Sequence, residues 1–391
     1  MNKIKLKKTF RPTPGYLWIF SNEIDGKLSE YTPGEIVQIY LHNNKFFGIG
    51  YVNPKTLIAV RIISFSKKEI NKEFIKVVLK RAIDYRKSIN FFYKDACRIF
   101  YSESDGLPGL IIDRYKNYLS VQTLTAGIEN LYPMIRDVLI DLLHPKAIIL
   151  KNDSNFRTYE GLEQYVTVDY GKYEHMQIIS EEGVKYFVDL LSGQKTGFFL
   201  DQRLNRLFLR EVLKRKNYKR FLDCFSYSGG WAFSAGYTFS GEITCVDSSE
   251  KAIQLIKKNA ELNRKNVNAI KKDVFDFLNE CHDNNEKFDC IVLDPPAFIK
   301  TKSKISEGIK GYKEINQRAM RILNKGGMLI TSSCSHHMYK EMFFEMLRSC
   351  CKDTKRNFRI LYNGTQSPDH PILLTMPETE YLKTVFLENI D

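Results

Sequence analysis

Beyond Leu190 the sequence alternates between short apolar runs and amphipathic segments, and this alternation constrains the fold most. Runs typical of buried strands, such as RFLDCF, EITCVD and FDCIVLD, are separated by stretches with apolar residues at helical spacing. Strands that alternate with helices build a parallel sheet with helices on both faces. Residues 190–391 are therefore predicted to form an α/β domain around a parallel, doubly wound sheet.

The two preceding regions have different patterns. Residues 1–66 contain the short β-rich runs GEIVQIYL, KFFGIGYV and LIAVRIIS, separated by turn sequences, which predicts a small barrel-like domain. From Lys67 the spacing becomes helical and strand signals then return. Residues 67–189 are predicted to form an α+β domain with an antiparallel sheet. The sequence thus predicts three domains.

The composition narrows the class of protein. No apolar run approaches the ~18 residues of a membrane helix, and no apolar segment follows the basic start as in a secretory signal. The eight cysteines form no CxxC pair, as expected for reduced thiols in the cytoplasm. Of the net charge of +13, residues 1–70 carry 11 Lys and Arg against 5 Asp and Glu. A nucleic acid partner fits this basic region, and so does a lysine-rich surface that is merely solvated.

Four successive predicted strands end in an aspartate: Asp223, Asp247, Asp273 and Asp294. Open α/β sheets bind ligands beyond the carboxyl ends of their strands. The glycine-containing turn LDCFSYSGG follows the first of these strands, and Asp247 could accept both hydroxyls of a ribose. Acidic groups repel phosphates, so a cationic ligand with a ribose, S-adenosylmethionine (SAM), fits better than a pyrophosphate cofactor. Tight packing at the turn and helix capping by the aspartates are the alternatives.

Several longer stretches give the chain a resemblance to a known family. These stretches are GYLWIFSNEI, FFGIGYVNPKTLIAVRI, SESDGLPGLIIDRY, GQKTGFFLDQRLNR, LDCFSYSGGWAFSA, VLDPPAF, TSSCS and DHPILLTMPETEYLK. In them the chain resembles the large-subunit 23S ribosomal RNA cytosine-5 methyltransferase family over nearly its whole length. The resemblance implies an RNA-binding PUA domain, a central α+β domain of the EEHEE type and a Rossmann-like, seven-stranded class I SAM-dependent methyltransferase domain.

The resemblance also implies which residues hold SAM. Asp247 would bind the ribose and Asp273 the adenine amino group, with Val274 beside the ring. The methionine part would be lined by residues of the glycine-containing turn, namely Asp223, Tyr227, Ser228 and Gly229. The segment from Lys195 to Arg203 would close over the cofactor, with Phe199 and Asp201 nearest. That segment could instead be an inter-domain linker held by hydrogen bonds.

Cys334, in TSSCSHH, has three interpretations: a buried thiol, a zinc ligand beside His336 and His337, or a nucleophile. Structural zinc needs four ligands, and no second cysteine lies at ligand spacing. A nucleophilic role has a clear chemical reason, because carbon 5 of cytosine becomes reactive only when a thiolate adds to carbon 6. Three other cysteines lie inside predicted strands and are expected to be structural thiols: Cys224, Cys245 and Cys290.

The motif DPPAF lies at the end of the fourth strand. Asp294 is a candidate to grip the N3/N4 edge of cytosine and, if its pKa is raised by burial, to donate a proton to N3. The alternative role of Asp294 is to cap the turn made by Pro295 and Pro296. These two prolines are themselves candidates to border the substrate. Phe298 is a candidate to stack on a base. A DPP-aromatic motif is also typical of enzymes that methylate exocyclic amines, which need no cysteine; here Ala297 intervenes.

The expected partner is 23S ribosomal RNA. A cytosine must be unpaired or flipped out to reach a thiolate, which favours naked or partly assembled RNA. Arg203 is a candidate phosphate contact or a solvated arginine. Methylation of another atom, on guanine or an exocyclic amine, and a non-catalytic role in RNA binding or ribosome assembly remain alternatives. No metal and no membrane partner are expected. Some relatives of the family dimerise, so a homodimer is compatible with the sequence.

Overall fold

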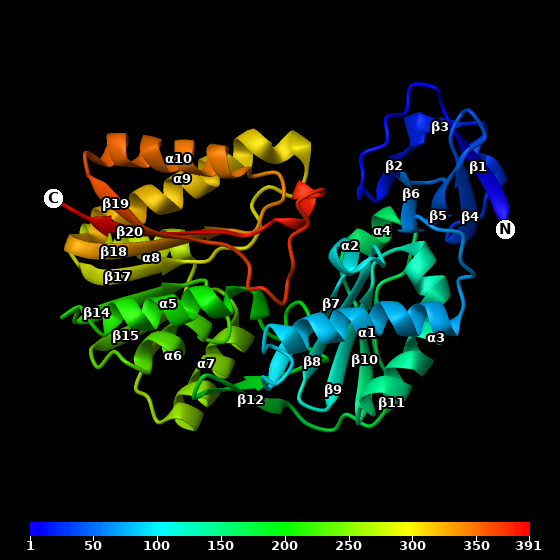
Figure 1. Ribbon diagram of the computed structural model, residues 1–391. Helices are drawn as coiled ribbons and strands as arrows, with labels where there is room; N and C mark the ends of the chain where they lie inside the picture. Colours follow the sequence, from blue (N-terminus) through cyan, green and yellow to red (C-terminus); the bar gives the residue numbers. More distant parts are fainter. The chain divides into compact units, whose positions relative to one another are not determined.

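The computed structural model describes residues 1–391, which fold into two compact units (Figure 1). The first unit contains three segments, Met1–Gln177, Val188–Phe198 and Pro368–Thr379. The second contains Ile178–Phe187, Phe199–Ser367 and Glu380–Asp391. Each unit is therefore made of three segments that alternate along the chain with those of the other unit. The predicted domain boundaries at residues 66 and 189 do not include this alternation. The division into three domains stays a prediction.

The N-terminal part of the first unit is a six-stranded sheet with the order β2-β6-β5-β4-β1-β3. Its pairs are antiparallel except for β1 with β4. Alternate residues of β4 point into the core, where Val37 and Ile39 pack with Val60 and Ile62. The strands are β1 (Asn2–Leu6), β2 (Trp18–Phe20), β3 (Ile24–Asp25), β4 (Glu35–Tyr40), β5 (Phe46–Val52) and β6 (Ile58–Ser64).

The rest of the first unit is built on a five-stranded sheet with the order β11-β10-β9-β8-β7. The predicted antiparallel sheet is corrected in one place: β9 and β10 are parallel, because helix α3 carries the chain back across the sheet between them. Helix α1 begins at the N-cap Asn71, whose side chain accepts from the Phe74 N–H at 3.0 Å. The elements are α1 (Lys72–Ser88), β7 (Ala96–Tyr101), α2 (Ser102–Asp105), β8 (Leu110–Tyr115), β9 (Tyr118–Thr123), α3 (Ala126–Leu143), β10 (Ala147–Asn152), α4 (Phe156–Tyr159) and β11 (Tyr165–Gly171).

The second unit contains a seven-stranded sheet with the order β16-β15-β14-β17-β18-β20-β19. The first five strands in this order are parallel, as predicted. Strand β20 is the exception to the predicted parallel sheet: it inserts antiparallel between β18 and β19, because it is joined to β19 without a crossover helix. The strands are β14 (Arg220–Cys224), β15 (Glu242–Asp247), β16 (Asn268–Lys271), β17 (Phe288–Leu293), β18 (Leu323–Ser333), β19 (Phe358–Gly364) and β20 (Lys383–Asn389).

Helices cover both faces of this sheet (Figure 1). One group packs together through α9, and the other through α6. The first group is α8 (Val274–Asp283), α9 (Ile305–Ile322) and α10 (Lys340–Thr354); the second is α5 (Arg203–Leu213), α6 (Gly230–Gly236) and α7 (Glu250–Asn263). A hairpin of β12 (Gln177–Glu181) and β13 (Val184–Val188) precedes them. The strand order reverses between β14 and β17, and doubly wound sheets bind ligands at such a switch point.

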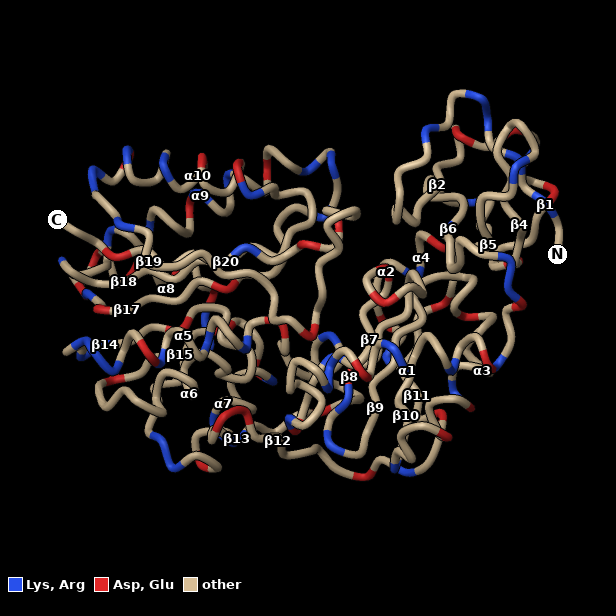
Figure 2. Tube along the Cα trace, viewed as in Figure 1, with Lys and Arg blue, Asp and Glu red and all other residues tan.

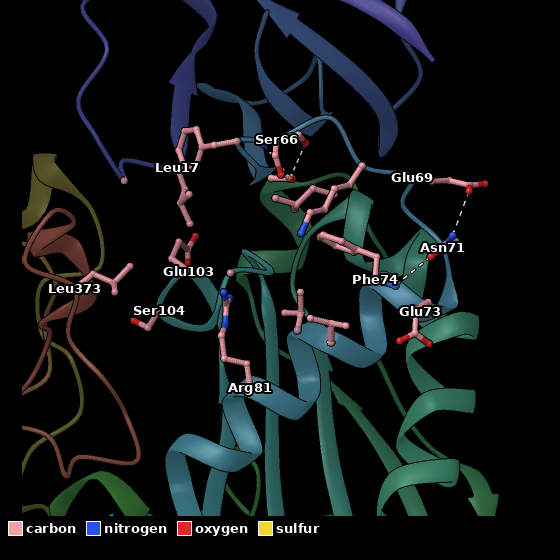
Figure 3. A pocket seen from close by; sticks show the side chains of 18 residues that line it. Leu17, Ser66, Glu69, Asn71, Glu73, Phe74, Arg81, Glu103, Ser104 and Leu373 are labelled. Carbon is pink, nitrogen blue, oxygen red and sulfur yellow. Dashed lines mark hydrogen bonds between the residues drawn. The ribbon is translucent and has the colours of Figure 1, made fainter. Parts of the chain in front are cut away.

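The first unit has an open pocket of about 770 Å³ between the segment after β6 and helix α1 (Figure 3). Its charged lining is mixed: Arg81 and Lys68 lie among Glu69, Glu73 and Glu103. No residue that the sequence singles out for cofactor or substrate lies in this lining. No helix of the chain is both long and apolar enough to cross a membrane.

Candidate active site

The four aspartates lie at one edge of the seven-stranded sheet. Asp223 is the second-to-last residue of β14, Asp247 is the last residue of β15, and Asp294 directly follows β17. Asp273 comes two residues after β16 and is the N-cap of helix α8. Because these strands are parallel neighbours, their carboxyl ends meet at one edge of the sheet, with β14 and β17 on either side of the switch point.

The turn after β14 has an unusual backbone. Phe225 and Tyr227 have φ angles of 61° and 49°, in the left-handed region that side chains with a Cβ rarely occupy. Hydrogen bonds hold this conformation: the Ser226 hydroxyl donates to the Asp223 carbonyl at 2.6 Å, and the Tyr227 N–H donates to Asp247 Oδ2 at 2.9 Å. Strain of this kind, roughly 1–3 kcal/mol per residue, is typical of ligand-binding turns. Through the hydrogen bond from Tyr227 to Asp247, the backbone of this turn lies at the edge where the aspartates meet.

Gly229, also left-handed at φ 74°, closes the turn. A Cβ at this position would lie 2.4 Å from the Phe233 ring, so no larger residue fits without displacing that ring. Ser228 beside it is buried, and its carbonyl accepts from Asn259 Nδ2 at 2.9 Å. The predicted turn residues are thus built into a rigid strand-to-helix connection.

Asp223 is a fully buried carboxyl with an incomplete set of partners. Its Oδ2 accepts from the Ala232 N–H at 3.0 Å, whereas its Oδ1 has no hydrogen-bond partner. Burial raises the pKa of Asp223 well above its ordinary value, and the negative charges of Asp294 and Asp247 raise it further. A buried acceptor without a donor is costly. A ligand that brings an ammonium or sulfonium cation would relieve this cost, as the methionine part of SAM does.

Asp247 and Asp273 retain acceptor capacity at the same edge. Asp247 accepts from the backbone N–H groups of Tyr227 and Ser249, both at 2.9 Å, and is half-buried. Asp273 caps α8 by accepting from the N–H groups of Phe275 and Asp276 on a single oxygen, Oδ1. Each carboxylate oxygen has two lone pairs, so hydroxyl or amino donors of a nucleoside can still be bound. The capping and ligand-binding interpretations are therefore compatible.

The Asp294 carboxyl is held by two side chains that sequence reasoning missed. Trp231 Nε1 donates to Asp294 Oδ2 at 2.9 Å, and Gln202 Nε2 donates to Oδ1 at 3.2 Å. Gln202 also bonds to Ser332 Oγ at 3.2 Å. Two N–H donors stabilise a carboxylate, which favours Asp294 as an acceptor over the predicted proton donor. Trp231 and Gln202 lie within the quoted GGWAFSA and GQKTGFFLDQR stretches, but neither spacing indicates that they meet Asp294.

The segment Lys195–Arg203 divides between the two units. Up to Phe198 it packs within the first unit, where the Phe198 N–H donates to the Tyr115 hydroxyl at 3.1 Å. In the second unit, the Phe199 ring lies edge-on to Tyr227, with centroids 5.4 Å apart. The Asp201 carboxyl is buried and accepts from the Tyr381 hydroxyl at 2.6 Å. Phe199 therefore lies at the strained turn, whereas the Asp201 carboxyl is bound to Tyr381.

Two of the predicted substrate contacts have partners within the protein. Arg203 is 2% exposed, and its Nε donates to Glu181 at 3.1 Å, so the predicted phosphate contact is instead a buried ion pair. The Phe298 ring packs against Tyr312 with centroids 4.7 Å apart and against Phe275 at 6.2 Å. The half-buried Phe298 ring thus belongs to an aromatic cluster, and its stacking on a base stays a prediction. Packing of an aromatic ring explains the position of Phe298, and pairing of a buried charge explains that of Arg203.

Cys334 follows the last residue of β18 and is half-buried, unlike the cysteines inside the strands. The strand register pairs Leu293 with Thr331, so Asp294 and Cys334 both lie just beyond the paired ends of neighbouring strands. Pro295 is buried and Pro296 is exposed next to Asp294. Thiol and carboxyl therefore occupy the same edge of the sheet.

The interior cysteines have the structural role expected of them. Cys224, Cys245 and Cys290 are fully buried, and burial raises the pKa of each thiol well above its ordinary value. Such thiols stay protonated and unreactive at neutral pH. The imidazole of His336 lies 5.7 Å from the Tyr381 ring, and no group of three or more His, Cys, Asp or Glu residues in the chain could hold a metal ion.

Two regions of the chain match known protein families. Residues 3–65 match the PUA-like domain family, and residues 207–361 match the family described as Conserved hypothetical protein 95. A relative from Enterobacter sp. (strain 638), Ribosomal RNA large subunit methyltransferase I, is 36% identical over 375 residues, covering 94% of this chain and 93% of its own.

Two solved structures share the whole fold. A candidate SAM-dependent methyltransferase from Streptococcus mutans superposes with a TM-score of 0.82 at 20% identity, covering 99% of this chain and all of the other. The candidate methyltransferase SMU.776, complexed with S-adenosylhomocysteine (SAH), gives a TM-score of 0.83 at 21% identity over the same shares of the two chains. The predicted fold class, PUA-like and then Rossmann-like, and the predicted cofactor SAM are confirmed. With 36% identity over almost its full length, the chain belongs to the ribosomal RNA large subunit methyltransferase I family.

Proposed function

We propose that this protein uses SAM to methylate carbon 5 of a cytosine in 23S ribosomal RNA, through a covalent adduct with Cys334. The observation that carries the proposal is the position of the half-buried Cys334 thiol, directly beyond β18 and beside β17, the strand that leads to Asp294. The relatives that share 36% identity are named for the large-subunit ribosomal RNA, which supports this substrate class.

The chemistry assigns one bond change to each step. The Cys334 thiolate adds to carbon 6, and the electron pair of the 5,6 double bond moves onto carbon 5. SAM, when bound, supplies the methyl group that carbon 5 accepts. A base then removes the carbon-5 proton, the double bond re-forms, and the thiolate leaves. The protein contributes the nucleophile and holds the ring between it and the cofactor.

The cofactor is proposed to bind along the edge where the four aspartates meet. Asp247 accepts from the ribose hydroxyls, and Asp273 from the adenine amino group, with the buried Val274 beneath the ring. Asp223 Oδ1, which lacks a protein donor, accepts from the methionine ammonium. The remaining contacts of the methionine part come from Tyr227, Ser228, Gly229 and Phe199, with Asp201 as support.

Asp294 is proposed to position the cytosine. Its carboxylate, oriented by Trp231 and Gln202, accepts from the cytosine N4 amino group. The neighbouring Pro295 and Pro296 fix the direction of the chain as it leaves β17. Asp294 therefore identifies the base by its amino edge, and uracil, which has a carbonyl at that position, would be rejected.

The RNA is proposed to be naked or partly assembled, with the target cytosine unpaired or flipped out. The PUA-like sheet supports an RNA contact, because its surface carries the exposed basic residues Lys3, Lys7, Lys8 and Arg11 near β1 (Figure 2). Such contacts with phosphates give affinity without sequence selectivity.

The experiment compares wild type, Cys334→Ala and Cys351→Ala on 23S ribosomal RNA with labelled SAM. Cys351 is the matched control because it is also half-buried, on helix α10. We expect 5-methylcytosine in digested RNA with wild type and Cys351→Ala, and loss of at least about a thousandfold in rate with Cys334→Ala. Full activity of Cys334→Ala would contradict the covalent mechanism and favour methylation of an amine or another ring atom. Cofactor binding without methyl transfer by wild type would favour an assembly role.

A further inference from the structure

Lys383 is a buried cation on the strand next to the one that leads to Cys334. Strand β20 pairs with β18 so that Lys383 lies opposite Ser333. The Lys383 side chain is 7% exposed, and its Nζ donates to the carbonyls of Ser335 at 2.9 Å and Tyr381 at 2.7 Å. Ser335 directly follows Cys334, so the ammonium group contacts the backbone one residue beyond the residue that carries the thiol. Both hydrogen-bond partners are neutral, and the positive charge is left for another group to balance.

The Asp294 carboxyl lies at the same edge of the sheet as Cys334, and further groups near the thiol come from β20, from α9 and from the loop itself. From β20, burial lowers the pKa of Lys383 to about 8, whereas the charges of Cys334 and Glu380 favour the ammonium form. From α9, burial and then Cys334 raise the pKa of Tyr312 to about 12, so its hydroxyl stays neutral. In the loop itself, His336 lies against the Tyr381 ring, whose hydroxyl donates to Asp201. Of these groups, Lys383 brings a positive charge that interacts with the thiol.

We propose that Lys383 is a positioning residue that holds Cys334 in its ionised, nucleophilic form. This inference rests on the proposed covalent function and names the group that makes it work near neutral pH. The thiol loses its proton to solvent, no bond to Lys383 forms, and the ammonium stays beside the sulfur. When the thiolate adds to carbon 6, the negative charge of the sulfur moves to the cytosine ring. The charge returns to the sulfur when the thiolate leaves.

The ion pair explains why the lysine is buried at all. A buried lysine whose hydrogen-bond acceptors are two neutral carbonyls is costly to keep charged. A thiolate beside it offsets that cost, and by the same interaction the ammonium favours the thiolate. A purely structural lysine would tie Ser335 to Tyr381 equally well at every pH. The pH dependence of Cys334 reactivity separates the two roles.

The experiment measures alkylation of Cys334 by iodoacetamide in the full-length protein between pH 5.5 and 9.5, read by mass spectrometry of the peptide. Lys383→Gln keeps donors for both carbonyls but removes the charge, and Lys383→Arg keeps the charge. Lys325→Gln is the matched control, because Lys325 is an exposed lysine at the opposite end of β18. Cys351 in the same digest is the internal reference.

We expect the wild-type midpoint for Cys334 to lie below about 8.5, the ordinary value of a free thiol. Lys383→Gln should raise it by about one pH unit, whereas Lys383→Arg and Lys325→Gln should leave it nearly unchanged. Methyl transfer by Lys383→Gln should fall about tenfold at pH 7 and recover at higher pH. An unchanged midpoint, or an equal loss of activity at every pH, would overturn the inference.

Two results keep the inference separate from the proposed function. The wild-type midpoint needs no variant and no RNA, so a midpoint at or above the ordinary value overturns the role of Lys383 even if Lys383→Gln does not fold. If Cys334→Ala is fully active while the midpoint still shifts, the covalent function fails and so does the role assigned to Lys383 in it. If Cys334→Ala is inactive but no midpoint shifts, only the inference about Lys383 fails.

Discussion

Two buried carboxyl groups of the second unit have opposite surroundings. Glu181, on β12, accepts two hydrogen bonds of 2.7 Å from Arg206 and one of 3.1 Å from Arg203. Burial alone would raise the pKa of Glu181, but the charges and hydrogen bonds of Arg206 and Arg203 lower it overall. Asp223, at the end of β14, has one backbone donor and a pKa raised well above its ordinary value by burial.

The difference separates a structural carboxylate from one that is arranged for a ligand. Glu181 has its counter-charges inside the protein, so its site is complete without any other molecule. Asp223 has an oxygen without a donor, at the edge of the sheet where the cofactor is proposed to bind. The buried carboxylate is therefore neutralised by the chain at Glu181, whereas the carboxyl of Asp223 keeps an oxygen without a donor.

The largest effect is expected for Glu181→Gln. This substitution leaves two buried guanidinium groups without a carboxylate and should lower the free energy of unfolding by about 3–5 kcal/mol. Urea unfolding followed by Trp231 fluorescence measures it, in a Trp18→Phe background because the chain contains 2 tryptophans. The neighbouring, exposed Glu182 is the control, and Glu182→Gln should have little effect. Equal loss in both variants would show that Glu181 is not the centre of an ion-pair cluster.

Asp223→Asn should affect ligand binding and leave the fold intact. The amide retains an acceptor for the Ala232 N–H but removes the negative charge that the cofactor's ammonium needs. Affinity for SAM, measured by titration calorimetry, should fall by about 10- to 100-fold, equivalent to about 1.4–2.7 kcal/mol. Unfolding without cofactor should show equal or higher stability. Unchanged affinity would remove Asp223 from the cofactor site.

Arg203→Gln should cost less stability than Glu181→Gln, because Arg206 still pairs with Glu181. We expect a loss of about 1–2 kcal/mol in the same unfolding assay. The salt dependence of RNA binding should not change, since a buried arginine contacts no phosphate. A slope of log K against log salt that falls by about one would instead restore the phosphate contact predicted from the sequence.

The smallest effect is a pH dependence that runs in opposite directions at the two carboxyls. The folded pKa of Asp223 lies above its ordinary value of 3.8, so its charge destabilises the fold progressively as pH rises above 3.8. The folded pKa of Glu181 lies below 4.5, so its contribution is present above pH 4.5 and is lost as pH falls through the folded value. Stabilisation by Asp223→Asn, measured without cofactor, should thus vanish near pH 3.5 and grow toward pH 7. A constant difference would contradict the raised pKa.

Much of the site's framework could be predicted because it depends on neighbours in sequence. The alternation of strands and helices predicts parallel strands, and parallel strands bring Asp223, Asp247 and Asp294 to one edge by topology alone. Cys334 could be identified in the same way, since it directly follows a strand.

The partners of these residues could not be predicted, because they come from distant parts of the chain. Gln202 meets Asp294 across 92 residues, and Lys383 reaches the Ser335 carbonyl across 48. No periodicity relates such positions. The same limit explains Arg203 and Phe298, whose residue types suit RNA contacts but whose positions are taken by Glu181 and Tyr312.

By itself, the sequence determined the alternating strand–helix units, the acidic edge of the sheet and the thiol beyond β18. Each of these follows from a short-range pattern and the direction of the chain. Only the tertiary structure decided which polar groups are satisfied. Antiparallel insertion of β20 brings Lys383 opposite Ser333 and to the Ser335 carbonyl, and the packing of α5 against the β12–β13 hairpin buries Arg203 with Glu181. Burial makes an unpaired charge costly, so the three-dimensional environment, and not the residue type, separates a structural ion pair from a site that needs its ligand.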